Sequence, residues 1–174
     1  MARRNSTKRI ALLSLFCALG VVILYLGSFI DVLDMSAAVL ASLLCVAAVI
    51  EYGSSSAWLV YAATSCLSLL VLPQRMPAFM YAVFFGFYPI IKQKLEGRLK
   101  RWVCWLVKVV IFNAAIVLWI AAAKWLFLIE DTPLAFDVLV FLLANATLLL
   151  YDVALTRAVS FYIFKIRKRF KFDK

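Results

Sequence analysis

Two charged residues inside long apolar runs are the best candidates for chemistry in this 174-residue chain. Lys108 lies about six residues into the run 102–129, and Asp152 lies in the last third of the run 134–164. Charges in hydrocarbon are costly and therefore mark candidate functional sites. If the two runs are antiparallel helices, both charges lie at similar depth, and we predict an intramembrane ion pair between them. The alternative is that Lys108 extends to the membrane surface while Arg157 holds Asp152.

A second group of polar and aromatic residues is predicted to meet at the outer side of the membrane, where a small molecule could bind. The proposed substrate-binding residues are Gln74, Arg75, Tyr81, Lys124 and Trp125. Arg75 is the only basic residue in a loop predicted to face outward, which suits an anionic group on a ligand. The alternatives are that Arg75 pairs with loop carboxylates at 31, 34 or 130, and that Lys124 extends to the surface beside Trp125.

No recognised catalytic pattern accompanies these residues. The chain has no His, which removes Ser-His triads and most transition-metal sites. "GSSSAW" is not a G-x-S-x-G nucleophile elbow, and no P-loop is present. The four Cys, at 17, 45, 66 and 104, form no CxxC motif and are expected to be packing residues. We predict no catalytic residues, no metal site and no cofactor, and we expect that the protein is not an enzyme.

The composition identifies the environment of these residues. Hydrophobic residues make up 67% of the chain and charged residues only 16%, whereas soluble domains are about half apolar and a quarter charged. A soluble globule of this size cannot bury so much apolar surface. The apolar runs are continuous rather than alternating, which favours helices over a barrel. We therefore predict an all-α, polytopic membrane helix bundle forming a single transmembrane domain, 1–174.

Six apolar runs are interpreted as membrane spans, although a span usually needs about 20 apolar residues. They cover about 10–30, 33–50, 57–72, 78–91, 102–129 and 134–164. The first run is too long for a signal peptide and is interpreted as a retained anchor. The fourth is short, so the third and fourth runs could instead form one re-entrant hairpin.

The basic residues predict the orientation. Of 19 Lys and Arg, four lie before residue 10, five between 92 and 101, and six in the basic tail 165–174. With six spans these three regions share one side, and the positive-inside rule places both termini in the cytoplasm. Anionic lipid headgroups are the expected partner of these charges, so the net charge of +10 does not require nucleic acid. The loop "EYGSSS", predicted on the same side, carries no Lys or Arg.

Small residues recur at helix-packing spacing in the first two spans. The candidate docking residues are Ala11, Ser14 and Ala18 in the first span, and Ala37 and Ala41 in the second. Gly20 and Gly27 share another face of the first span. These ladders either pack inside the bundle or dock another membrane protein.

Six short spans with both termini inside, together with "YAVFFGFYPIIKQKLE" (81–96), resemble the substrate-binding S-components of energy-coupling-factor transporters. The segment is similar to an uncharacterised Gram-positive branch of such proteins. The resemblance implies a bacterial cell membrane protein that binds a vitamin-like small molecule and docks to a transmembrane T-component and ATPase subunits. The predicted function is the substrate-binding subunit of a small-molecule uptake transporter. The alternatives are a membrane scaffold or assembly protein without transport activity and, less favoured, a lipid-modifying enzyme.

Overall fold

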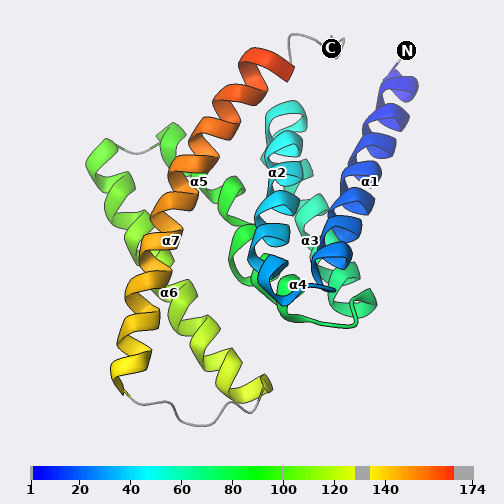
Figure 1. The fold of residues 1–174 in the computed structure, drawn as a ribbon. Helices are drawn as coiled ribbons and strands as arrows, with labels where there is room; N and C mark the ends of the chain where they lie inside the picture. The colour runs from blue at the N-terminus through cyan, green and yellow to red at the C-terminus, as the bar shows by residue number, and fades with distance from the viewer. Residues whose placement is uncertain (1, 99, 128–133, 167–174) are drawn as a thin grey trace. The chain divides into compact units, whose positions relative to one another are not determined.

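The computed structural model describes residues 2–98, 100–127 and 134–166 and is built from helices (Figure 1). No strand occurs among the described residues, in agreement with the predicted all-α class. In chain order the elements are α1 Ala2–Gly27, the 3-10 turn η1 Asp31–Leu33, α2 Asp34–Tyr52, α3 Ser54–Val71, α4 Met76–Met80, the π-helical turn η2 Tyr81–Phe85, α5 Tyr88–Arg98, α6 Arg101–Phe127, α7 Leu134–Phe161 and a second π-helical turn, η3 Tyr162–Ile166.

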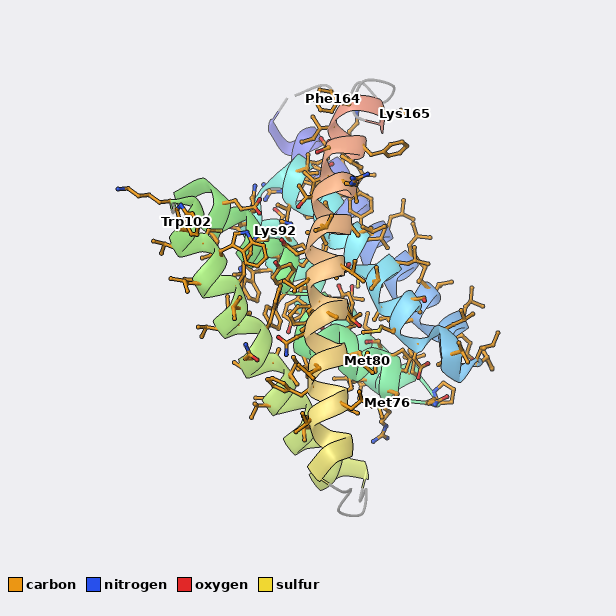
Figure 2. The ribbon with its side chains drawn as sticks, turned by 60° about the vertical axis from the view of Figure 1, so that its left-hand side comes forward. Met76, Met80, Lys92, Trp102, Phe164 and Lys165 are labelled. Atoms are coloured by element: carbon orange, nitrogen blue, oxygen red, sulfur yellow. The ribbon has the colours of Figure 1, made fainter. Side chains whose placement is uncertain are left out.

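Four helical stretches of the described chain are long and apolar enough to cross a membrane. They are Thr7–Gly27, Asp34–Tyr52, Ser54–Val71 and Val138–Lys165. The apolar stretch Trp102–Leu118 of α6 is shorter, and Trp102 at its start is 86% exposed (Figure 2). The first three stretches lie close to the predicted spans 10–30, 33–50 and 57–72.

The chain divides into two compact units, residues 1–97 and 98–174, and each is described by itself. The division falls within the basic segment 92–101, and apolar runs lie on both sides of it.

Close approach between helices characterises the first unit, in which α1, α2 and α3 pack against one another. The inner face of α1 presents Cys17, Gly20, Leu24 and Gly27, at spacings of three and four residues. A Cβ added to Gly27 would overlap the Cβ of Ala37. Only glycine therefore allows α1 and α2 to approach this closely, as is common between helices in membranes.

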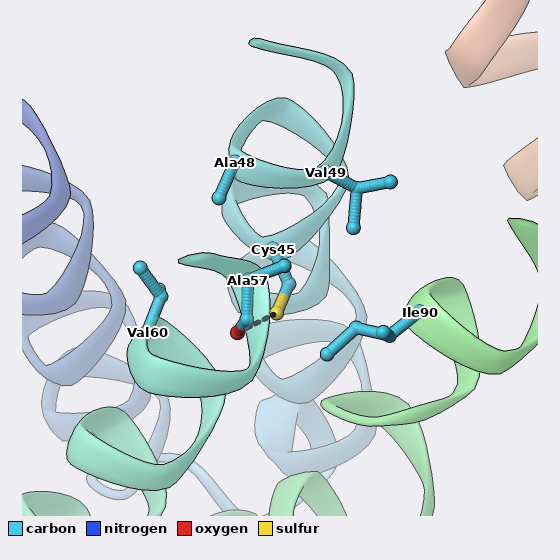
Figure 3. Packing of buried hydrophobic residues seen from close by; sticks show 6 residues of the cluster. All are labelled: Cys45, Ala48, Val49, Ala57, Val60 and Ile90. Carbon is cyan, nitrogen blue, oxygen red and sulfur yellow. Dashed lines mark hydrogen bonds between the residues drawn. The ribbon is translucent and has the colours of Figure 1, made fainter. Parts of the chain in front are cut away.

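One cluster in the core of this unit is made of small and β-branched side chains. Figure 3 shows the cluster of Cys45, Ala48 and Val49 from α2, Ala57 and Val60 from α3, and Ile90 from α5. The thiol of Cys45 lies 3.7 Å from the Ala57 carbonyl oxygen and donates to it. Ile90 is completely buried, so α5 contributes to the same core as α2 and α3.

The turn between α2 and α3 is short because one residue adopts a left-handed backbone. Gly53 has φ +81°, a conformation that side chains with a Cβ rarely adopt. Its N–H donates to the Val49 carbonyl, which closes the end of α2. The predicted loop "EYGSSS" is reduced to a turn at Gly53, because α2 continues to Tyr52 and α3 begins at Ser54.

The stretch predicted as a fourth span, 78–91, is interrupted rather than one continuous helix. Met76 and Met80 bound α4 (Figure 2), which has Pro77 in its first turn, and the π-helical turn η2 follows directly. The next helix, α5, begins at Tyr88 and includes the basic residues Lys92 and Lys94, which we expected in a loop. Hydropathy detects the apolar composition of this stretch but not the break.

Aromatic contacts and one hydrogen bond accompany the break. The Tyr61 hydroxyl donates to the Ala82 carbonyl at 2.7 Å, inside the π-helical turn. The rings of Phe84 and Tyr88 stack with centroids 5.2 Å apart. A Cβ on Gly86 would lie 2.6 Å from Cδ2 of Tyr61. The absence of a side chain at Gly86 therefore allows the Tyr61 ring to pack against the backbone.

The second unit consists of α6 and α7, which pack against each other. Buried residues recur on α6 at every fourth position, as Cys104, Lys108, Phe112 and Ile116. On α7 the buried residues are Leu148, Tyr151 and Leu155. This periodicity gives each helix a single inner face, and Lys108 lies on that of α6.

Candidate functional site

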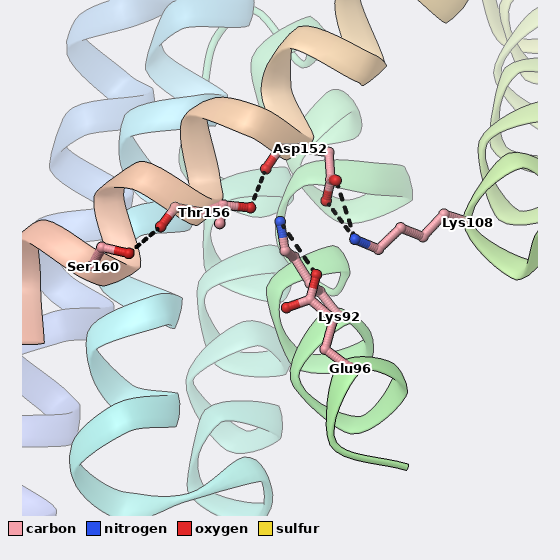
Figure 4. A network of polar contacts seen from close by, with 6 residues as sticks. All are labelled: Lys92, Glu96, Lys108, Asp152, Thr156 and Ser160. Atoms are coloured by element: carbon pink, nitrogen blue, oxygen red, sulfur yellow. Dashed lines mark hydrogen bonds and ion pairs between the residues drawn. The ribbon is translucent and has the colours of Figure 1, made fainter. Parts of the chain in front are cut away.

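The second unit contains the predicted ion pair. The Nζ of Lys108 lies 3.1 Å from both carboxylate oxygens of Asp152, and the two side chains are 8% and 15% exposed (Figure 4). Arg157, the alternative partner of Asp152, is exposed on α7. The contact predicted between Lys108 and Asp152 is therefore present in the structure.

The geometry of this pair suits helix fixation better than acid–base chemistry. Each charge lowers the energetic cost of burying the other. Removing one partner would leave an uncompensated buried charge, which costs about 3–5 kcal/mol in proteins. The pair therefore joins α6 to α7.

Other polar side chains of α7 bond within their own helix. The Asn145 amide donates to the Phe141 carbonyl at 3.0 Å. The Thr156 hydroxyl donates to the Asp152 carbonyl at 2.8 Å, and Ser160 repeats this pattern one turn later (Figure 4). Such bonds to the preceding turn satisfy hydroxyl and amide groups in apolar helices.

A second ion pair lies on α5, between the predicted spans 78–91 and 102–129. The Nζ of Lys92 lies 3.8 Å from a carboxylate oxygen of Glu96 (Figure 4). The Lys92 side chain is 4% exposed and that of Glu96 is 47% exposed. The i,i+4 spacing of a Lys and a Glu was a signal that could have predicted this contact.

The predicted substrate-binding residues are found in different surroundings. Gln74 and Arg75 directly precede α4, and Arg75 is exposed. Tyr81 is 1% exposed, with its ring centroid 6.2 Å from that of Tyr61, so it belongs to the interior of the first unit. Lys124 and Trp125 belong to α6, but their side chains lie outside the described part of the chain.

The candidate docking residues separate into two groups. Ala37 and Ala41 of α2 are 5% and 1% exposed, so they pack inside the first unit, and the prediction that they dock a partner is corrected. Ala11, Ser14 and Ala18 are exposed on α1. The glycine face of α1 is the one turned inward, because only glycine permits the contact with Ala37.

Polar contacts that the sequence did not predict gather at one end of the first unit. The Arg9 guanidinium donates to the Ser56 hydroxyl and lies 5.8 Å from the ring centroid of Tyr52. The Ser54 hydroxyl donates to Oε1 of Gln93 at 2.9 Å. Residues from α1 and α5 thus reach the turn "EYGSSS", which has no basic residue of its own.

The described residues include no group of three or more His, Cys, Asp or Glu that could hold a metal ion. Comparison with protein-family models, with curated proteins and with solved structures yields no match. The class of the protein is therefore inferred from the fold and the apolar helices alone. They indicate an all-helical membrane protein.

Proposed function

We propose that this chain is a multi-pass subunit of the bacterial cell membrane that binds a small, vitamin-like solute for uptake. Both termini lie in the cytoplasm in this proposal, and six segments enter the membrane. The observation that carries the proposal is the interruption of the helix between Met76 and Arg98 by a π-helical turn.

Interrupted helices are informative because backbone polar groups must be satisfied away from water. Irregular backbone at membrane depth is tolerated where protein buries it or where it lines a cavity, and transporters use such segments to form solute sites. Here Tyr61 satisfies the carbonyl of Ala82, while Phe84 and Phe85 are buried beside it. The turn keeps its own backbone bond, from the Gly86 N–H to the Tyr81 carbonyl, and a segment that leaves the regular α-helical pattern in this way can change its conformation when a solute binds.

Arg75 gives this segment a group suited to a ligand. Arg75 lies at the N-terminal end of α4, just after α3. The 18 residues of α3 form a helix about 27 Å long. Ser56, at the opposite end of α3, contacts Arg9. If the Arg9 end is cytoplasmic, Arg75 faces outward, where an anionic group of a solute can bind the guanidinium.

The proposed partners follow from the surface of the chain. The exposed residues Ala11, Ser14 and Ala18 offer α1 to a transmembrane T-component that works with ATPase subunits. The basic residues bind the anionic headgroups of the cytoplasmic leaflet.

Native mass spectrometry of the protein, purified in mild detergent, tests the proposal. We expect a retained small molecule, and we expect Arg75→Ala to weaken its binding. Arg157→Ala is the matched control, because Arg157 is also exposed. If the two variants bind the solute with equal affinity, Arg75 does not contribute to the binding site. If the protein retains no solute from its host membrane, the proposed function is contradicted.

A membrane scaffold without transport activity is the second candidate. It is favoured by the same exposed small residues of α1, which suit a permanent partner as well as a transport module. Co-purification distinguishes the two candidates: an associated ATPase supports transport, and a stable complex with a different membrane protein supports the scaffold.

A further inference from the structure

The outer face of α6 carries a regular seam that the ion pair does not use. Its residues are separated by three and four positions in turn, and they are Val103, Leu106, Val110, Asn113, Val117 and Ile120. Val103, Leu106, Val110 and Val117 are 44–70% exposed. At 100° per residue the centre of this seam lies roughly 150° from the buried face that carries Lys108.

The spacing is that of a heptad repeat. If Val103 is the first apolar position (a) of a heptad, Val occupies every a position. The second apolar position (d), three residues later, is occupied by Leu106, Asn113 and Ile120. β-branched residues at the first position with Leu at the second are typical of two-stranded parallel coiled coils. Asn113 is the one polar residue of the seam and occupies a second position. A shallow hollow of about 680 Å³ lies on this face and is lined in part by Val110, Asn113 and Val117.

Asn113 is the residue that distinguishes this seam from a lipid-facing surface. It is the thirteenth of 27 residues in α6, about 18 Å from the start of the helix, which places it near the middle of a hydrocarbon core about 30 Å thick. One amide N–H donates to the Val109 carbonyl at 2.9 Å. The side chain has a second N–H and an acceptor oxygen, and for these no further bond is found within the described chain.

A second copy of this chain supplies the matching groups. All copies enter the membrane with the same orientation, so two α6 helices related by a two-fold axis along the membrane normal run parallel. Asn113 then faces Asn113 of the second copy at equal depth, and the amide oxygen of each accepts from the N–H of the other. Amides paired in this way contribute to helix association in membranes. We propose that the seam of α6 is a homodimer interface.

Cysteine cross-linking in native membranes tests the geometry. In a background where the four natural cysteines are replaced by alanine, Val110→Cys and Val117→Cys should give disulfide-linked dimers. Cysteines introduced at Phe112 and Ile116, on the buried face, should not. Equal cross-linking at all four positions, or monomers only, would overturn the proposal.

The contribution of the amide is tested by energy transfer between labelled full-length proteins in lipid vesicles. Asn113→Val should weaken dimerisation about tenfold. The matched control is Asn145→Val, because Asn145 makes the same bond to the preceding turn at 3.0 Å but lies on α7. The proposal fails if both variants dimerise as the unmodified protein does, or if the face of α6 proves to be covered by residues 1–97 of the same chain.

Discussion

The two units hold their helices together in different ways. In the first unit, Gly27 and Ala37 let the backbones of α1 and α2 approach closely, and the core around Cys45 consists of small side chains. In the second unit, the main polar link between α6 and α7 is the pair Lys108–Asp152. Lipid removes most of the hydrophobic driving force between helices, so close packing and polar contacts must supply it. This chain uses close packing in one unit and a polar contact in the other.

The largest effect is expected from breaking the ion pair. Lys108→Leu or Asp152→Leu alone leaves one buried charge and should destabilise the protein by about 3–5 kcal/mol. The reciprocal exchange, Lys108→Asp with Asp152→Lys, should restore part of this loss because the charges again match. Expression level and thermal unfolding in detergent measure both effects.

Arg157→Ala, on the same helix but exposed, is the control and should have little effect. If the exchanged double variant is expressed no better than either single exchange, Lys108 and Asp152 are not partners.

A smaller loss is expected from filling the close contact in the first unit. Gly27→Ala places a methyl group against Ala37 and should destabilise this unit by about 1–3 kcal/mol through overpacking. Gly97→Ala is the control, because no atom lies within 4 Å of its added Cβ. Thermal unfolding midpoints should fall for the first variant only, and equal midpoints would show that α1 and α2 are not in close contact.

The smallest effect is expected at the interruption. Tyr61→Phe removes the donor to the Ala82 carbonyl and should cost about 1 kcal/mol. Tyr25→Phe, at a partly exposed tyrosine of α1, provides the comparison. Hydrogen exchange at residues 81–87 should increase in the Tyr61 variant. Unchanged exchange there would show that the π-helical turn does not depend on Tyr61.

The sequence predicts the elements of regular composition well. Long apolar runs require helices in lipid, and the turn at Gly53 separates the end of α2 from the start of α3. The pair Lys108–Asp152 could be predicted because two charges at equal depth in neighbouring runs have few other partners.

The rest depends on tertiary contacts that composition does not reveal. The π-helical turn η2 accompanies contacts with Tyr61, which lies about 20 residues earlier in the chain. Whether the glycine face of α1 or its Ala11–Ala18 face is buried depends on which helix packs against α1. Similarly, the burial of Lys92 could not be inferred from a segment whose charge is mostly basic.

The most direct test of this account is the side of the membrane on which each connection lies. Reporter fusions after Gly53, Arg75, Gly97, Thr132 and Lys174 sample the connections that follow the second to fifth predicted spans and the C-terminal tail. We predict cytoplasmic signals at Gly53, Gly97 and Lys174 and external signals at Arg75 and Thr132, because the basic regions share the inner side. An external signal at Gly97 or Lys174 would contradict the account.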